Sequence, residues 1–226
     1  MSMPFYVPPE QAMREKAEFA RKGISRGRSL VALQYDQGVV LVAENPSNNL
    51  RKISEIYDRI AFAGVGRFNE FDQLRQAGVR AADVQGYRYS RDDVEGRALA
   101  NVLAQVIGNW FTHEPKPFEI EILIAEVGRN GNGDHLFHVT YDGTVIDETD
   151  YCVLGGDSDT VGGRMKDSFT HGLTLGDAVK AAVAALAGQD RTLQVDDLEV
   201  ALLERGDHRR CFARLSDTEV AALIGS

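Results

Sequence analysis

The segments of this chain that have the pattern of β-strands occur in groups, and helical segments separate the groups. Short runs rich in Val, Leu and Ile, bounded by polar turns such as Asp36-Gln37-Gly38, predict strands. They are expected at residues 29–35, 38–43, 53–57, 59–63, 119–127, 135–141, 151–154, 198–203 and 211–215. A parallel βαβ sheet would need one crossover helix after each strand, so this grouping predicts a layered α+β domain instead.

Between the strand groups the apolar residues recur with the period of a helix. One helix is expected to begin near Asn69, and a second covers Val94 to Trp110, with Ser90 as its N-terminal signal. Thr174-x-x-Asp177 resembles a capping box and predicts the start of another helix. The remaining helices are expected at residues 158–169, 174–187 and 216–224.

An amphipathic helix precedes the first strand. Three prolines within residues 1–9 prevent a helix there, because each proline fixes φ and removes a hydrogen-bond donor. In residues 10–24 the apolar side chains have helical spacing, at Met13, Ala17, Ala20 and Ile24. We expect this helix to be an N-terminal extension that lies outside the core of the main domain.

The charges of the chain narrow the classes of function. It has 25 Lys and Arg against 34 Asp and Glu, a net charge of −9, which argues against a general nucleic-acid-binding protein. The first thirty residues nevertheless carry six basic and three acidic side chains. This segment therefore binds nucleic acid, meets an acidic surface of a neighbouring subunit, or forms a solvated helix face.

Location is predicted from what the sequence lacks. No apolar run reaches the roughly 18 residues that a membrane-spanning helix needs, and residues 1–9 do not have the pattern of a secretory signal. Cys152 and Cys211 are the only cysteines, and their spacing matches no metal motif. The sequence predicts a cytoplasmic protein in a reducing environment, without a membrane partner.

No motif in the sequence assembles a catalytic or cofactor site. The chain lacks Gly-x-Ser-x-Gly and His-Glu-x-x-His, and the Gly-x-Gly at Gly64 has Asn69 where a dinucleotide loop has its third glycine. His135 and His138 lie three residues apart in a strand pattern, which places them on opposite faces. We therefore predict no catalytic residue, no cofactor and no zinc site.

Several segments, taken together and in order, resemble the α-type subunits of 20S proteasomes, and in detail the actinobacterial form. The resemblance runs from about Phe5 to Leu223. It is carried by residues 9–14 (PEQAMR), 19–24 (FARKGI), 27–33 (GRSLVAL), 42–47 (VAENPS), 52–59 (KISEIYDR), 68–71 (FNEF) and 116–119 (KPFE).

The resemblance implies the N-terminal-nucleophile hydrolase fold, a four-layer αββα sandwich, with an extra N-terminal helix. Residues 1–226 would form one domain, with a gate segment at 1–9, the extension helix at 10–24 and the sandwich at 28–226. The chain would be a non-catalytic subunit of a heptameric α ring, stacked on β subunits that hold the catalytic threonine. A hexameric ATPase activator would dock on this ring through its C-terminal tails and deliver tagged, unfolded proteins for degradation.

The same resemblance implies a docking pocket between adjacent α subunits. In it Lys52 would pair with the C-terminal carboxylate of an activator tail, because a compact ammonium suits a single terminal carboxylate. Gly66 and Glu18 match further members of that pocket.

Two other elements are implied near the axial channel of the ring. The closed gate would be formed by four residues that precede the extension helix, Phe5, Tyr6, Val7 and Pro8. The loop that narrows the pore would be formed by Thr112, His113 and Glu114.

Two alternatives to this function remain open. The position that matches the catalytic threonine of the β subunits falls at Arg28 or Ser29, inside the chain, whereas such a nucleophile needs its own α-amine as a base. Cleavage before Ser29 would produce a self-processed hydrolase with its own activity. The other alternative is a nucleic-acid-binding protein that uses the basic helix at residues 10–24.

Overall fold

The structure is a computed structural model, and it describes residues 8–47, 49–129 and 133–225. It contains two five-stranded sheets. The strands of the first sheet are β1 (Leu30–Tyr35), β2 (Gly38–Glu44), β8 (Tyr151–Leu154), β9 (Leu198–Glu204) and β10 (Phe212–Arg214). Those of the second sheet are β3 (Ile53–Tyr57), β4 (Ile60–Gly66), β5 (Ile120–Glu126), β6 (His135–Val139) and β7 (Val145–Glu148).

Six α-helices accompany the sheets in the described residues. They are α1 (Pro9–Ile24), α2 (Phe68–Arg88), α3 (Gly96–His113), α4 (Ser158–Ser168), α5 (Leu175–Ala187) and α6 (Asp217–Gly225). Short 3₁₀ helices lie at Arg91–Asp93 and Val195–Asp197. Among the helices that the structure describes, none has both the length and the apolar character needed to span a membrane.

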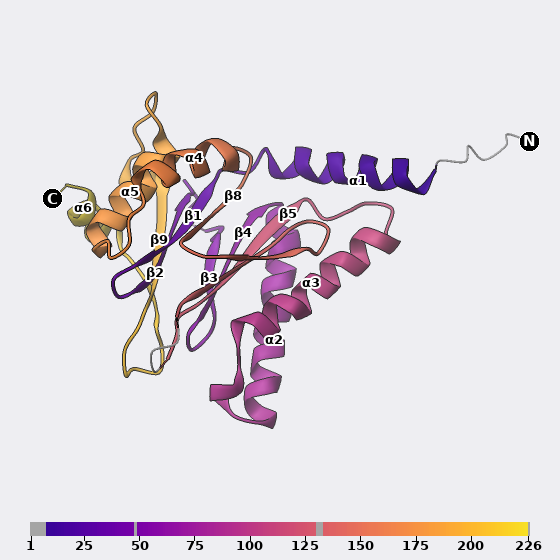
Figure 1. The fold of residues 1–226 in the computed structure, drawn as a ribbon, viewed down its shortest axis with the longest axis horizontal. Helices are drawn as coiled ribbons and strands as arrows, with labels where there is room; N and C mark the ends of the chain where they lie inside the picture. The colour runs from indigo at the N-terminus through magenta and orange to yellow at the C-terminus, as the bar shows by residue number, and fades with distance from the viewer. Residues whose placement is uncertain (1–7, 48, 130–132, 226) are drawn as a thin grey trace, which may run out of the picture.

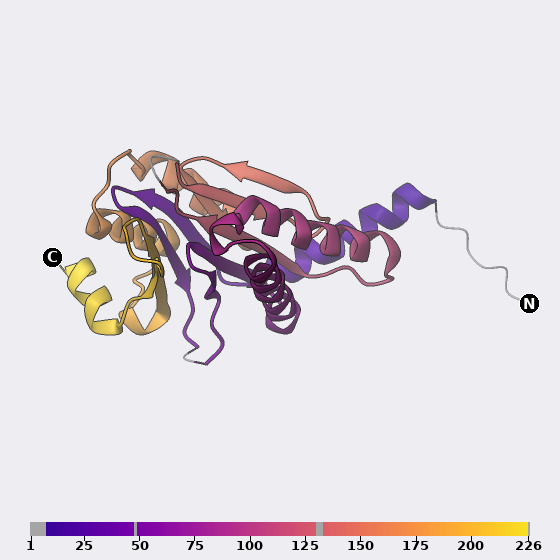
Figure 2. The same cartoon turned by 90° about the horizontal axis from the view of Figure 1, so that it is seen from below.

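The two sheets pack face to face between layers of helices (Figures 1 and 2). The strand order is β10-β9-β2-β1-β8 in the first sheet and β3-β4-β5-β6-β7 in the second, with antiparallel pairing throughout. Helices α4, α5 and α6 cover the outer face of the first sheet, and α2 and α3 cover that of the second. The predicted αββα sandwich with an extra N-terminal helix is confirmed.

The burial of both faces explains why the central strands are apolar throughout. In β2, Leu41 and Ala43 lie in the core between the sheets, whereas Val40 and Val42 lie in the core beneath α4 and α5. Successive side chains of a strand point to opposite faces, so a strand that is covered on both sides needs apolar residues at every position.

The residues of helix α1 that are buried against the body lie in its C-terminal half. Ala20 and Ile24 are buried in a cluster with Tyr141, whereas Met13 and Phe19 are 38% and 48% exposed. Figures 1 and 2 both show the N-terminal half of the helix projecting beyond the sandwich. The apolar face predicted for residues 10–24 is therefore covered only in part by this chain.

The structure shifts several predicted boundaries by one to three residues and adds one strand. Ser90 accepts a hydrogen bond from the Asp92 N–H and starts the 3₁₀ helix, so α3 begins only at Gly96. Strand β7 is absent from the prediction because its residues are half-buried or exposed and lack the apolar pattern of the other strands. The predicted cap of α5 is confirmed, since Thr174 Oγ1 accepts a hydrogen bond from the Asp177 N–H at 3.2 Å.

A buried carboxylate joins the two sheets at one end of the sandwich. The side chain of Glu199, in β9, is 1% exposed and forms an ion pair with Arg214 of β10. It also accepts hydrogen bonds from the N–H groups of Lys52 and Ile53, at 2.9 and 3.2 Å, and from Asn45 Nδ2 at 2.6 Å. Since Ile53 begins β3, Glu199 holds the edge of the second sheet against the first.

Replacing Glu199 by Ala is expected to lower the free energy of unfolding by about 3–5 kcal/mol, because Arg214 and three other donors lose a buried acceptor. Glu199→Gln keeps one acceptor oxygen and is expected to cost less, about 1–3 kcal/mol. Urea titration of the purified chain measures both effects. Glu204→Gln, at an exposed position of the same strand, is the matched control, and an equal loss in Glu199→Ala and this control would contradict the role.

Candidate functional site

Lys52 lies just before β3, and backbone carbonyls hold its ammonium group. Nζ donates hydrogen bonds to the Arg28 carbonyl at 2.6 Å and to the Glu44 carbonyl at 3.0 Å. The Lys52 backbone N–H is bound by the Glu199 carboxylate. Three parts of the chain that lie far apart in the sequence therefore fix the position of this side chain.

The surroundings of Lys52 lower the pKa of its ammonium group. Burial lowers the pKa of the ammonium to about 8, because a charged group is disfavoured where water is excluded. The carboxylates of Glu44 and Glu199 oppose this shift, and the Arg28 guanidinium adds to it. An ammonium has three donors, and within the described residues two of them are used. Lys52 can thus donate to one further acceptor.

A cleft of about 480 Å³ lies between the turn after α1 and helices α4 and α5. Arg28 and Glu44, whose carbonyls bind Lys52, are on its wall. Glu44 pairs with Arg28 at 2.5 Å and with Arg191 at 3.1 Å. The charged side chains that line the cleft are Arg26, Arg28, Arg164, Arg191, Glu44, Asp157 and Asp190. Four guanidinium groups against three carboxylates leave an excess of positive charge, which suits an acidic ligand.

Gly66 lies against the same turn, at the end of β4. Its φ is +112°, and a Cβ there would lie 2.0 Å from the Glu119 carbonyl oxygen, so a side chain is not accommodated. A Cβ on Gly27, the residue before Arg28, would lie 3.1 Å from the Gly66 nitrogen. The structure therefore brings Gly66 close to the segment that binds Lys52.

Glu18 lies on the exposed side of α1. It lines a hollow on the helix surface together with Glu10, Gln11 and Arg14. The charged groups that act on the Lys52 ammonium are those of Glu44, Glu199 and Arg28. Within the described part of one chain, the structure does not bring Glu18 and Lys52 together.

The gate residues fall mostly outside the described part of the chain. This is so for Phe5, Tyr6 and Val7, whereas Pro8 is exposed and directly precedes α1.

The residues predicted for the pore loop lie at the C-terminal end of α3. Thr112 and His113 form the last turn of α3, where their side chains bond to carbonyls four residues earlier, and Glu114 is the C-cap. The loop itself covers residues 114–119. Its conformation is fixed by Trp110, which stacks on Phe118 with the ring centroids 4.7 Å apart.

Ser29 is enclosed by the chain. It precedes β1, is 6% exposed, and follows Arg28 in an uninterrupted peptide. Gly155 lies against it, because a Cβ on Gly155 would be 2.9 Å from the Ser29 Cα. A Cβ on Gly156 would likewise lie 2.4 Å from the Ser25 carbonyl oxygen. Because Gly155 and Gly156 have no side chains, the turn at residues 25–29 can pack against the end of β8.

One group of side chains was not foreseen from sequence spacing. His138, Glu148 and Cys152 offer ligand atoms that all lie within 4.8 Å of one another. Our prediction of no zinc site used neighbours in the sequence, whereas these residues come from β6, β7 and β8. The pairing of the strands would have indicated this group, but the spacing of residues in the sequence does not reveal which strands pair.

Comparison with known proteins identifies the family of this chain. The family described as "Proteasome subunit" matches residues 24–202. The chain is 52% identical over 225 residues to the proteasome subunit alpha of Acidimicrobium ferrooxidans, which covers 100% of this chain and 97% of that protein. The chain belongs to the proteasome subunit family.

Other relatives of this proteasome subunit carry the same name. The proteasome subunit alpha of Saccharopolyspora erythraea is 54% identical over 229 residues, covering 100% of this chain and 90% of that protein. That of Thermomonospora curvata is 51% identical over 226 residues, covering 99% and 98%. The predicted resemblance to actinobacterial α-type subunits is therefore confirmed along the whole chain.

Lys52 is expected to react with acetic anhydride at a lower pH than an exposed lysine of the same subunit. Only the neutral amine is nucleophilic, and a pKa of about 8 makes half of it neutral near that pH. Competitive labelling followed by peptide mass spectrometry gives the midpoint, with Lys166 on α4 as the internal reference. A midpoint for Lys52 that is not below the reference would contradict its desolvated environment.

The lowered pKa of Lys52 also determines whether the free energy of unfolding rises or falls with pH. The unfolded chain holds the Lys52 proton up to its ordinary pKa of 10.5, so between about pH 8 and 10.5 it binds more protons than the folded chain. The contribution of Lys52 to the free energy of unfolding is therefore expected to rise with pH in that window. Urea titrations of the native chain and of Lys52→Met at both ends of the window measure it, and parallel pH curves would contradict the assignment.

Proposed function

We propose that this chain is a non-catalytic α-ring subunit of a 20S proteasome core particle. It would join other α subunits in a heptameric ring, scaffold a ring of β subunits, control entry to the proteolytic chamber and dock a hexameric ATPase activator. The observation that carries the proposal is the match to proteins named proteasome subunit alpha over the whole chain, including the helix that precedes β1.

The enclosure of Ser29 supports a non-catalytic role. An N-terminal nucleophile uses its own α-amine as the base, and that nitrogen is held here in the peptide bond to Arg28. The hydroxyl-bearing residue is also buried beneath the turn that follows α1. Catalysis in the assembled particle is therefore assigned to the β subunits.

The surroundings of Lys52 support a docking site for the terminal carboxylate of an activator tail. Among the described residues its ammonium uses two of three donors, and the adjoining cleft carries more guanidinium than carboxylate groups. A carboxylate that bonds to a partly buried ammonium gains a charge-assisted hydrogen bond. Gly66 packs against Gly27, which precedes the residue whose carbonyl binds the Lys52 ammonium, so its backbone is proposed as part of the same pocket.

The pocket is proposed to lie between two subunits, because Glu18 is distant from Lys52 in one chain. Glu18 is exposed near the middle of α1, and the N-terminal half of this helix projects beyond the sandwich (Figure 1). A neighbouring copy in the ring would place its own α1 beside Lys52. In this arrangement Glu18 would approach the ammonium from the neighbour.

Exposed apolar groups on α1 support contact with another subunit. Phe19 lines a groove of about 360 Å³ with Ala12, Pro115 and Pro117. A helix that keeps part of its apolar face uncovered in the single chain is typical of an interface with a partner. We assign this surface to α–α contacts within the ring.

Three of the six basic residues near the N-terminus make contacts within the chain, which disfavours the nucleic-acid alternative. Lys16 Nζ donates to the Phe111 carbonyl at 2.9 Å, and the Arg21 guanidinium lies 5.5 Å from the Tyr141 ring centroid. Arg28 pairs with Glu44. These three charges hold α1 and the following turn on the body.

The link from α1 to the loop at residues 114–119 supports the gate and pore assignments. Lys16 bonds to the last turn of α3, and Lys116 in the loop lies 5.9 Å from the Phe19 ring centroid. These contacts hold the middle of α1 against the proposed pore loop. Residues 1–8 are proposed to close the channel above this loop, through which unfolded substrates would pass in a cytoplasmic particle.

Replacing Lys52 by Met is expected to weaken activator docking by about 10- to 100-fold, which corresponds to the loss of one charge-assisted hydrogen bond. Activator-stimulated degradation of an unfolded protein should fall accordingly, while hydrolysis of a short peptide by the intact particle is kept. Lys166→Met, at an exposed position on α4, is the matched control. Unchanged stimulated degradation in an intact Lys52→Met particle would remove Lys52 from the pocket.

Co-expression with a proteasome β subunit is expected to give a stacked particle with heptameric rings in native mass spectrometry. The intact mass should show that the chain continues upstream of Ser29. A chain that begins at Ser29 and hydrolyses amides without a β subunit would instead establish the self-processed hydrolase.

A further inference from the structure

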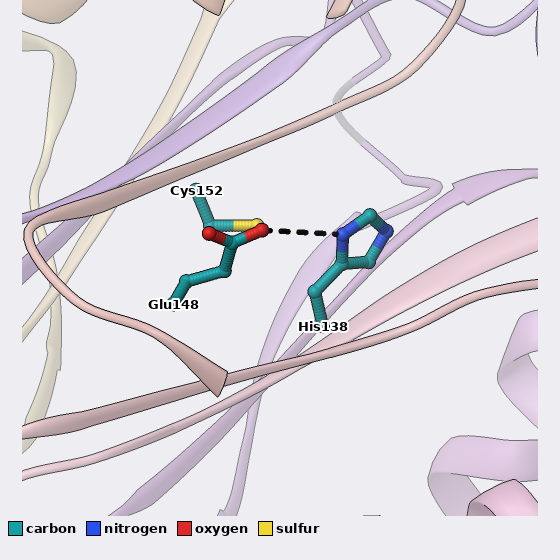
Figure 3. Close-up of side chains that lie close together, drawn as sticks. All are labelled: His138, Glu148 and Cys152. Atoms are coloured by element: carbon teal, nitrogen blue, oxygen red, sulfur yellow. Dashed lines mark ion pairs between the residues drawn. The ribbon is translucent and has the colours of Figure 1, made fainter. Parts of the chain in front are cut away.

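Four strands bring a group of ligating side chains together at the open edge of the sandwich. His138 comes from β6, Glu148 from β7, Cys152 from β8 and Glu121 from β5. Figure 3 shows the side chains of His138, Glu148 and Cys152 pointing toward one another. Nothing in the proposed docking, gating or scaffolding roles uses this group.

The group is largely enclosed, with one side open. Cys152 is 2% exposed and lies in the core between the two sheets, and the His138 side chain is 12% exposed. The Glu148 side chain is 33% exposed. An ion can therefore enter from the side of Glu148 and would be enclosed once bound.

The polar atoms of the group lie close together without bonding directly. His138 Nδ1 is 3.8 Å from Glu148 Oε1, and His138 Nε2 is 3.6 Å from Glu121 Oε2. Both distances exceed the roughly 2.7–3.2 Å of a hydrogen bond. His138 Nε2 is buried and has no hydrogen-bond partner among the described residues. Buried polar atoms of this kind are rare without a reason.

We propose that His138 Nδ1, Glu148 and Cys152 bind a Zn²⁺ ion, with Glu121 orienting the imidazole through its other ring nitrogen. Imidazole, carboxylate and thiolate are the ligand types that zinc takes in proteins, and a thiolate selects against Mg²⁺ and Ca²⁺. A histidine that binds zinc commonly directs its second nitrogen at a carboxylate, as His138 does here toward Glu121. Water would complete the tetrahedral set.

The geometry of the group is close to that of a zinc site. Zinc bonds of about 2.0–2.3 Å in a tetrahedron separate the ligand atoms by roughly 3.3–3.8 Å. The ligand atoms here are within 4.8 Å of one another, so a contraction of about 1 Å closes the site. The charges also balance, since one thiolate and one carboxylate neutralise the two charges of the ion.

A protonated His138 between two carboxylates is the competing interpretation. Burial lowers the pKa of His138, but the carboxylates of Glu121 and Glu148 outweigh it and raise that pKa to about 9. This ion pair would leave the contacts of His138 with Glu121 and Glu148 longer than hydrogen bonds. It would not involve the Cys152 thiol. The zinc site uses all four side chains.

The bound ion would connect the two sheets. Cys152 belongs to the edge strand of the first sheet, and the other residues belong to the second sheet. Strand β7 is an edge of the second sheet and β8 an edge of the first, so the metal would join these two edges. The inference concerns the fold of the subunit and does not depend on the proposed proteasome function.

Metal binding is tested on the full chain after treatment with a chelator. Competition with a chromogenic chelator is expected to give one Zn²⁺ per chain. Co²⁺ is expected to give the spectrum of a tetrahedral site with a thiolate-to-metal charge-transfer band. Both signals should be lost in Cys152→Ser and His138→Asn. Glu121→Gln should weaken zinc binding by about 10- to 100-fold and keep the cobalt spectrum.

Matched controls separate the site from the other cysteine and from a neighbouring histidine. Cys211→Ser and His135→Asn should bind zinc as the native chain does. Circular dichroism and thermal melting in chelator establish that each variant folds, and Glu148→Gln, at a partly exposed position, decides the outcome if Cys152→Ser is unstable. The absence of stoichiometric zinc in the native chain, or equal binding in the native chain and in the ligand variants, would overturn the proposal.

Discussion

The Glu199 carboxylate is a charged group with almost no exposure to water, and it is tolerated there only while its donors surround it. A buried carboxylate that loses its hydrogen-bond donors is destabilised, because it remains without water. The fold therefore depends on keeping all the donors to Glu199 in place, which are Arg214, Asn45 and the N–H groups of Lys52 and Ile53. The edge of the second sheet is thereby fixed against the first. Because the Lys52 N–H is one of these donors, the same contact places the lysine beside the cleft. Packing of the sheets and position of the candidate docking residue follow from one polar cluster.

The start of β1 is where the proposed function expects the nucleophile of a catalytic relative, and here the chain covers it. Helix α1 leads without a break into the turn at residues 25–29, which the backbone of Gly155 and Gly156 accepts at close range. Ser29 is left without a free amine, and the surrounding cleft holds paired charges such as Arg28 and Glu44. A site built from fixed charges and a desolvated ammonium is suited to recognise an acidic group, whereas cleavage of a peptide needs an activated nucleophile.

Lys52 and His138 show two outcomes for a buried basic group. Carbonyl oxygens satisfy two donors of Lys52, which makes the side chain rigid and leaves one donor for a ligand. His138 faces two carboxylates at 3.6 and 3.8 Å, slightly too long for hydrogen bonds, and the Cys152 thiol lies within 4.8 Å of the His138 and Glu148 ligand atoms. The surroundings of Lys52 therefore suit a ligand that accepts a hydrogen bond. Those of His138 suit a bound cation. The difference lies in the partners that strand pairing supplies, neutral carbonyls in one case and acidic side chains in the other.

Local physical chemistry determined the order of helices and strands, because the period of apolar residues and the capping residues act within a few positions. It therefore predicted α1, the hairpin of β1 and β2, and the cap at Thr174, while the half-exposed strand β7 had no such signal. The role expected for Lys52 came from resemblance, since its neighbours in the sequence do not reveal a site. Only the tertiary structure decided which side chains meet. The contact of Glu199 with Lys52, the distance of Glu18 from it and the meeting of His138 with Cys152 depend on strand register and sheet packing, which join residues that the sequence keeps far apart.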